Sequence, residues 1–200
     1  MKIVGTGLPR TGTNSLKLAI ERLTGERCYH MFELFDHREH APEWIELARG
    51  GPTDWSFLGD FGSIVDWPGA AMWDRLVDDF PEAIVVHSVR DDAEQWWRSL
   101  DATVAATIRE RRDEEPDSPG RQFIMALVER AGWPSVDDAA AMQALYAEHD
   151  RRVRERVDPD RLVVFNPRDG WEPLAAALGV EVPDEPYPRV NTTEDYLRAT

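Results

Sequence analysis

The chain has 200 residues, a length that suits one globular domain or one domain with a helical insertion. Its 38 acidic and 23 basic side chains give a formal net charge of −15, which disfavours nucleic acid and anionic membranes as partners. The one cysteine, Cys28, excludes an intramolecular disulfide and a cysteine-based metal site. There is no apolar run of about 18 residues and no leader-like segment, so we expect a cytoplasmic protein without a membrane span.

Short apolar runs alternate with segments of helical periodicity along the chain. The apolar runs predict buried strands at 2–7, 27–31, 63–65, 83–89 and 162–165. Helices are predicted at 13–23, 36–50, 68–80, from 93, 136–156 and 171–178. Residues 109–121 are mostly charged or helix-breaking and predict an exposed loop between two helical segments. This alternation predicts an α/β fold, a parallel sheet with helices on both faces, whose ligands bind at the carboxyl ends of the strands.

The segment from Gly7 to Gly12 has the spacing of a phosphate loop, between a predicted strand and a predicted helix. Glycines let the backbone curl so that N–H groups point at an anion, and the helix N-terminus adds partial positive charge. Thr13 and Asn14 replace the usual Lys-Ser/Thr pair, and the cation is Arg10 within the loop. A guanidinium can bind two oxygens of a phosphate or sulfate, whereas the lost magnesium ligand disfavours nucleotide hydrolysis. The alternative is a simple glycine turn.

Residues 9–15, Pro-Arg-Thr-Gly-Thr-Asn-Ser, resemble the 5′-phosphosulfate loop of the sulfotransferase superfamily, whose motif reads Pro-Lys/Arg-Ser/Thr-Gly-Thr-Thr/Asn. These enzymes are similar in fold to P-loop kinases, which implies a three-layer architecture of the P-loop NTPase type. They use 3′-phosphoadenylyl sulfate (PAPS) as donor, release 3′,5′-adenosine bisphosphate (PAP) and need no metal. The resemblance implies that the 5′-phosphosulfate is bound by Arg10, Thr11, Gly12, Thr13, Asn14 and Ser15.

Two further segments carry the resemblance. Residues 85–91, followed by 96–99, resemble the family's 3′-phosphate site, which implies that Arg90 and Ser99 bind that phosphate. The spacing departs by one position, because Arg98 stands where the family has its serine. Residues 169–174 and 182–191 resemble the carboxyl end of the small bacterial branch, which implies that Asn191 or Arg189 closes over the nucleotide.

Sulfuryl transfer to an alcohol needs a proton acceptor and a cation at the leaving oxygen. We expect Arg10 to supply the charge. Asp66, at the end of the predicted strand 63–65, is the first candidate base, since burial can raise the pKa of a carboxyl group. The family's cytosolic branch has His-x-Pro where this chain has Asp66-Trp67-Pro68, and the alternative role for Asp66 is to cap the next helix. His30 is the second candidate, its alternative being a structural histidine.

Other aromatic and histidine residues have weaker assignments. His30, His37 and His40 match no standard zinc spacing, so we expect no metal site. Of the eight tryptophans, Trp55 and Trp67 are the two expected near an acceptor pocket, and most of the others are expected to pack in the core or at the surface.

Together these features predict a single sulfotransferase-like domain over 1–200, with a mainly helical acceptor-side region at about 93–156. The predicted reaction moves a sulfuryl group from PAPS to a hydroxyl or amine of a small molecule. The identity of the acceptor and the oligomeric state stay open. The alternatives are a magnesium-dependent kinase for small molecules or nucleotides on the same fold, and a non-catalytic nucleotide-binding protein.

Overall fold

The sheet at the centre of the molecule consists of five parallel strands in the order β2-β3-β1-β4-β5, as seen in a computed structural model that describes residues 1–190. The central strand, β1, pairs with β3 on one side and β4 on the other, so that Ile3 lies between Ser63 and Ile84. The prediction of a parallel α/β fold is confirmed. The strands are β1 (Ile3–Gly5), β2 (Cys28–Tyr29), β3 (Ser63–Ile64), β4 (Ile84–Ser88) and β5 (Leu162–Phe165).

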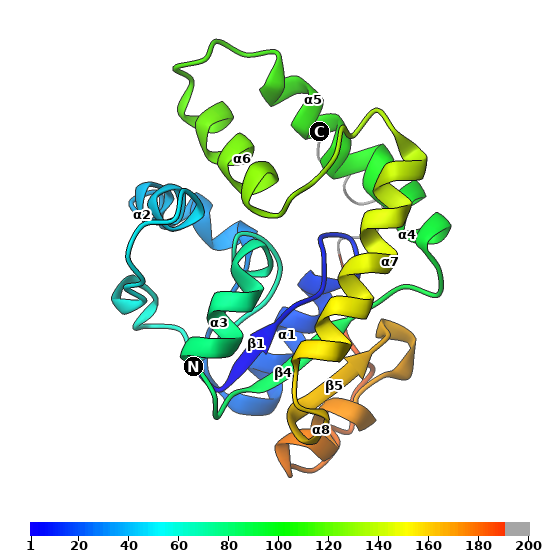
Figure 1. The fold of residues 1–200 in the computed structure, drawn as a ribbon. Coiled ribbons are helices and arrows are strands. Elements are labelled where there is room, and N and C mark those ends of the chain that lie inside the picture. The colour runs from blue at the N-terminus through cyan, green and yellow to red at the C-terminus, as the bar shows by residue number, and fades with distance from the viewer. Residues whose placement is uncertain (191–200) are drawn as a thin grey trace.

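Helices cover both faces of this sheet, because alternate side chains of each strand point to opposite faces. Ile3 and Val86 face helices α1 (Thr13–Thr24) and α8 (Glu172–Leu178). Val4 and Val85 belong to the larger core on the other face, which is formed with α3, α4 and α7. Figure 1 shows α7 crossing one face of the sheet with α1 on the other. The bounds of these helices are α3 (Trp73–Asp79), α4 (Ala93–Leu100) and α7 (Ala139–Arg156).

A helical layer stands above the carboxyl ends of the strands. It contains α2 (His40–Ala48), α5 (Ala106–Arg112) and α6 (Pro119–Arg130). Helices α2 and α6 pack against each other, and both lie above α3 in Figure 1. A π-helical turn, Asp101–Ala105, joins α4 to α5. Short 3-10 helices complete the fold at Met31–Phe35, Ser56–Leu58, Gly69–Met72, Pro159–Arg161 and Pro167–Asp169.

The predicted loop at 109–121 is wrong at both ends. Helix α5 continues to Arg112, where Arg109 donates hydrogen bonds to Asp101 and Asp137. Helix α6 begins at Pro119, with Ser118 as its N-terminal cap. Charged residues with high helix propensity form a stable helix when their charges are paired at the surface, which a count of charged and helix-breaking residues does not detect.

Other predicted elements are also shorter in the structure, among them one strand and two helices. The strand expected at 27–31 contains only Cys28–Tyr29, and the helix expected from residue 36 begins at His40, after a turn. Helix α7 begins at residue 139, because the Asp138 side chain accepts a hydrogen bond from the Ala141 N–H group and so caps the helix there. Within residues 1–190, no helix is both long enough and apolar enough to cross a membrane.

The packing of α1 on the sheet is testable with two leucines of that helix. Leu16 is fully buried, whereas the side chain of Leu18 is 38 % exposed. We expect Leu16→Ala to lower the free energy of unfolding by about 3 kcal/mol, because it leaves a cavity in the core. Leu18→Ala, the matched control, is expected to change it by less than about 1 kcal/mol. Urea denaturation followed by tryptophan fluorescence measures both, and equal losses would contradict this packing.

Candidate functional site

The loop between β1 and α1 forms one wall of a cavity of about 1030 Å³. Two of its residues have left-handed backbone conformations, Arg10 (φ 72°) and Gly12 (φ 88°). Such a conformation is strained for a side chain like that of Arg10 and is typical of functional loops. Helix α1 begins without a capping side chain and without an acidic residue in its first turn. Its N-terminal residues, from Gly12 to Ser15, line the cavity, so the positive end of the helix is available to an anion.

The phosphate loop is held by contacts from elsewhere in the chain. The buried indole of Trp96, on α4, donates its Nε1–H to the Pro9 carbonyl at 2.9 Å. The Thr11 hydroxyl donates to the Leu8 carbonyl at 2.7 Å and lies 2.6 Å from the Ser88 hydroxyl at the end of β4. A Cβ atom on Gly7 would lie 1.9 Å from that Ser88 oxygen, so only glycine fits there. Because both contacts of the Thr11 hydroxyl are made within the protein, this hydroxyl stabilises the loop.

Arg90, just after β4, is bound directly to the loop. Its Nε donates to the Arg10 carbonyl at 2.7 Å, and its backbone N–H donates to the Tyr146 hydroxyl at 2.8 Å. Partial burial lowers the pKa of the Arg90 guanidinium, which still carries its charge at pH 7. Arg10 in turn donates from Nε to the Ser99 hydroxyl at 3.2 Å. Neither Ser99 nor Arg98 lines the cavity, but Ser99 is partly buried and contacts the loop through Arg10, whereas the Arg98 side chain is exposed.

A second group of side chains that contacts the loop consists of Asp66, His30 and Thr13. The Thr13 hydroxyl donates to Asp66 Oδ1 at 3.0 Å, and His30 Nε2 lies 3.3 Å from Asp66 Oδ2 and 3.2 Å from the Thr13 oxygen. Asp66 has a left-handed backbone (φ 65°) immediately beyond β3. The Ala70 N–H of the following turn donates to the Asp66 carbonyl at 2.7 Å, whereas the Asp66 carboxylate contacts Thr13 and His30. Both candidate bases thus contact the same residue of the phosphate loop.

The hydrogen bonds of His30 determine its tautomer. Nδ1 accepts from the backbone N–H of Phe32 at 3.2 Å, so the ring proton is on Nε2 and points to Asp66 and Thr13. Burial is the main cause that lowers the pKa of His30, which keeps the ring neutral at pH 7. In this state neither ring nitrogen has a free lone pair for a substrate proton. His30 caps the turn at 31–35 and orients Asp66.

Many residues that line the cavity come from the turn at 31–35 and from the helical layer, and these are mostly apolar. We call this part of the lining the acceptor half; it also includes Trp67, which follows Asp66 in the chain. The apolar side chains that line it are Met31, Phe32, Leu34, Phe35, Ala41, Trp67, Val104, Phe123 and Ile124. Of the two tryptophans expected near an acceptor pocket, Trp67 lines this cavity and Trp55 does not. The Nε1–H of Trp55 donates to Asp79, and its ring packs against Trp44 and Phe80.

Several site residues were missed by the sequence analysis. Tyr146 on α7 orients Arg90, and its ring stacks on Trp96 with centroids 4.9 Å apart. Pro167 closes over the loop, because a Cβ on Gly12 would lie 2.3 Å from its Cγ atom. Arg168 lines the cavity next to it and pairs with Asp91. Arg189 also lines the cavity, and Asn191 lies outside the described residues. No local motif marks Tyr146 or Pro167, since both act through tertiary contacts.

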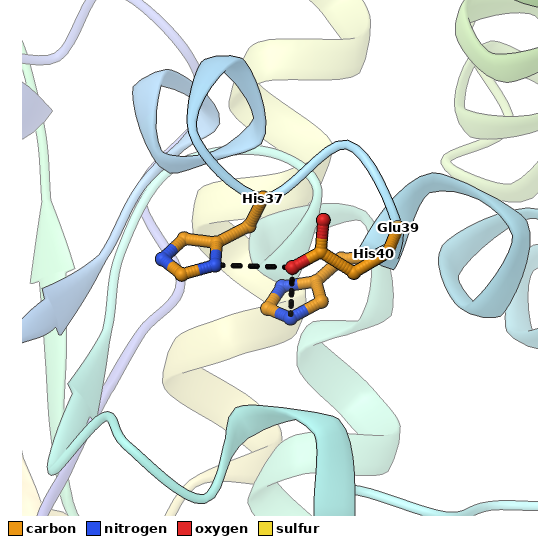
Figure 2. Close-up of side chains that lie close together, drawn as sticks. All are labelled: His37, Glu39 and His40. Carbon is orange, nitrogen blue, oxygen red and sulfur yellow. Dashed lines mark hydrogen bonds and ion pairs between the residues drawn. The ribbon is translucent and has the colours of Figure 1, made fainter.

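Histidines 37 and 40 form a separate cluster with Glu39 (Figure 2). Their ligand atoms lie within 4.8 Å of one another, and His30 is not part of this group. The always-protonated Arg27 guanidinium lies 3.0 Å from His37 Nε2, so that nitrogen accepts and His37 Nδ1 donates to Glu39 at 3.3 Å. His40 Nδ1 lies 3.2 Å from the Tyr29 hydroxyl. As arranged, the cluster is a hydrogen-bonded network that fixes the turn before α2.

Comparison with known proteins agrees with this geometry. A family model described as a sulfotransferase domain matches residues 2–196. The chain belongs to the sulfotransferase domain family. It is also 29 % identical over 219 residues to "Ava biosynthesis cluster protein M" of Aspergillus versicolor, an alignment that covers 99 % of this chain and 84 % of that protein. A sulfotransferase domain is consistent with a loop of phosphate-loop spacing and many apolar residues in the lining of one cavity.

The contact between Tyr146 on α7 and Arg90, which binds the phosphate loop, can be tested with substitutions of two tyrosines. Tyr146→Phe removes the acceptor of the Arg90 N–H, and we expect about fivefold weaker binding of PAP, from the loss of about 1 kcal/mol. Tyr187→Phe is the control, since the Tyr187 hydroxyl has no hydrogen-bond partner in the described part of the chain. Calorimetric titration with PAP measures both. Unchanged affinity in Tyr146→Phe would contradict a role for this contact in donor binding.

Proposed function

We propose that the protein is a metal-independent, PAPS-dependent sulfotransferase that modifies a hydroxyl or amine of a small molecule. The observation that carries this proposal is the contact of the Asp66–His30 pair with Thr13 of the phosphate loop, inside one cavity. A proton acceptor thereby lies beside the place where the loop would hold the group to be transferred. When bound, PAPS supplies that sulfuryl group, and its phosphate leaves with the electron pair of the broken S–O bond.

The residues of the donor side fit such a ligand. The uncapped N-terminus of α1 and the left-handed turn at Arg10 and Gly12 suit a 5′-phosphosulfate. Arg90 and Ser99 both contact Arg10, and we assign them to the 3′-phosphate. Further positive charge comes from Arg168 and Arg189 at the cavity wall. These arginines form a local positive region that can attract an anion, in a chain whose net charge is −15.

Asp66 is the proposed base, and His30 its positioning partner. The acceptor oxygen loses its proton to an Asp66 carboxylate oxygen as it forms the new bond to sulfur. His30 holds the carboxylate through Nε2–H and is itself fixed by the Phe32 N–H. Arg10 neutralises charge that develops on the leaving phosphate oxygen. The hydrogen bond from Thr13 fixes the distance between the base and the phosphate loop.

Neither of the two rival functions explains this geometry as well. A kinase on the same fold needs a Ser/Thr ligand for magnesium after the loop, and Asn14 stands there. A non-catalytic nucleotide-binding protein would have no use for a buried carboxylate bound to the loop. We further propose that residues 1–200 act as one domain in the cytoplasm, with the region at about 93–156 facing the acceptor.

The assignment of the base is tested with Asp66→Asn. Asparagine tolerates the left-handed backbone at this position and keeps the side-chain size, so the fold should be retained. We expect kcat with PAPS and 2-naphthol as probe acceptor to fall by a factor of about 100 or more. The affinity for PAP should stay within about twofold, because Asp66 is not assigned to donor binding.

Two outcomes would contradict this assignment. Full activity of Asp66→Asn would show that Asp66 is not the base. Tight binding of PAP by the wild-type protein, without turnover of PAPS by any phenol, alcohol or amine tested, would favour the non-catalytic function. The wild-type protein and Ser56→Ala, a substitution at an exposed turn outside the cavity, serve as references.

A further inference from the structure

The acceptor half of the cavity has an unexpected charge distribution. The charged residues that line the whole cavity, within the described chain, are Arg10, Arg38, Arg90, Arg111, Arg168, Arg189 and a single carboxylate, Asp66. The donor proposed above accounts for the arginines near the phosphate loop. Arg38 and Arg111 stand instead with the apolar residues of the acceptor half, on the turn before α2 and on α5. The proposed donor leaves these two cations without a role.

Arg111 has a partner within the protein, because it pairs with Glu114 in the turn after α5. Arg38 differs. Its side chain is exposed and makes no hydrogen bond or ion pair with any residue in 1–190, although the chain has an excess of carboxylates. An arginine that faces a cavity without an internal partner is available to an anionic ligand, which its guanidinium can bind with two parallel hydrogen bonds.

The residues beside Arg38 fix its backbone. Figure 2 shows His37 and His40 converging on Glu39. His37 also accepts a hydrogen bond from Arg27, and His40 lies within hydrogen-bond distance of the Tyr29 hydroxyl. The N–H of Ala41 also donates to the Arg38 carbonyl at 3.2 Å. Glu39, the acid next to Arg38 in sequence, thus pairs with the two histidines and not with Arg38. Contacts that restrict the turn also lower the entropic cost of binding a ligand at Arg38.

Apolar surface next to Arg38 indicates the rest of the ligand. Phe35 is 69 % exposed and Phe32 is 37 % exposed, although both line the cavity, and their rings stack with centroids 6.2 Å apart. Exposed aromatic rings at a cavity wall mark a binding site for an apolar or aromatic molecule. Asp66 lies at the base of the same cavity, beside Trp67.

We propose that the acceptor is an aromatic hydroxy acid or a similar apolar anion, whose hydroxyl faces Asp66 and whose anionic group binds Arg38. This inference rests on the proposed sulfotransferase function and assigns its substrate class. The aromatic body lies against Phe32 and Phe35, between the two polar ends. Arg38 is a specificity residue, since it contacts the acceptor far from the transferred group. A neutral acceptor of the same shape leaves Arg38 unpaired and binds more weakly.

The test compares 6-hydroxy-2-naphthoic acid with its neutral amide, 6-hydroxy-2-naphthamide. Calorimetric titration of the full-length protein at pH 7.5, with and without PAP, measures the two affinities. We expect the acid to bind about tenfold more tightly than the amide. Arg38→Gln should remove this preference by weakening the acid alone. Arg151→Gln is the matched control, because Arg151 is exposed on α7 and pairs only with Glu148 and Glu155 among the described residues.

Each outcome decides for or against the assignment. Loss of the preference in Arg38→Gln but not in Arg151→Gln supports it. Equal affinity for the acid and the amide, failure of both to bind at millimolar concentration, or a preference that survives in Arg38→Gln overturns it. The titration without PAP separates the two proposals. If PAP does not bind but the acid is preferred and depends on Arg38, the sulfotransferase proposal fails while the anion site remains.

Discussion

The parallel pairing of β1 with β3 and β4 is the constraint on which the site depends. Because the three strands are neighbours and run in the same direction, their carboxyl ends meet at one edge of the sheet. The phosphate loop follows β1, Asp66 follows β3 and Arg90 follows β4. Residues far apart in sequence thereby approach to hydrogen-bond distance, as Thr13 does to Asp66 and Arg90 to the Arg10 carbonyl. A change in strand order would separate Asp66 from the loop.

Contacts across this edge also explain how strained backbone is maintained. Arg10 and Asp66 both have positive φ angles, which cost on the order of 1 kcal/mol each for residues other than glycine. The Arg10 carbonyl is held by Arg90, and the Asp66 carboxylate by Thr13 and His30. The left-handed turns orient these groups toward the cavity, and the contacts offset the strain of those turns. The charge of the arginines at the cavity is independent of pH in the physiological range, in a chain whose net charge is −15.

The sequence was most informative where chemistry is encoded locally. The loop at 7–12, the strand that ends before Arg90 and the position of Asp66 at a strand end were predictable from apolar runs and glycine spacing. Tyr146, Pro167 and the partner of Ser99 were not, since each reaches the site through tertiary contacts over many residues. The sequence leaves both Asp66 and His30 as candidates, because the contact that favours Asp66 in our proposal, the Phe32 N–H on His30 Nδ1, depends on the local backbone conformation.

The central claim, a donor site formed by the phosphate loop and Arg90, is tested most directly by calorimetric titration. PAP without metal is compared with ATP plus magnesium, on the wild-type protein and on Arg90→Ala. We expect PAP to bind tightly without metal and to be preferred over magnesium-ATP. We expect Arg90→Ala to weaken PAP binding at least about 100-fold through loss of a charged, partly buried contact. A preference for magnesium-ATP, or PAP affinity that does not depend on Arg90, would contradict it.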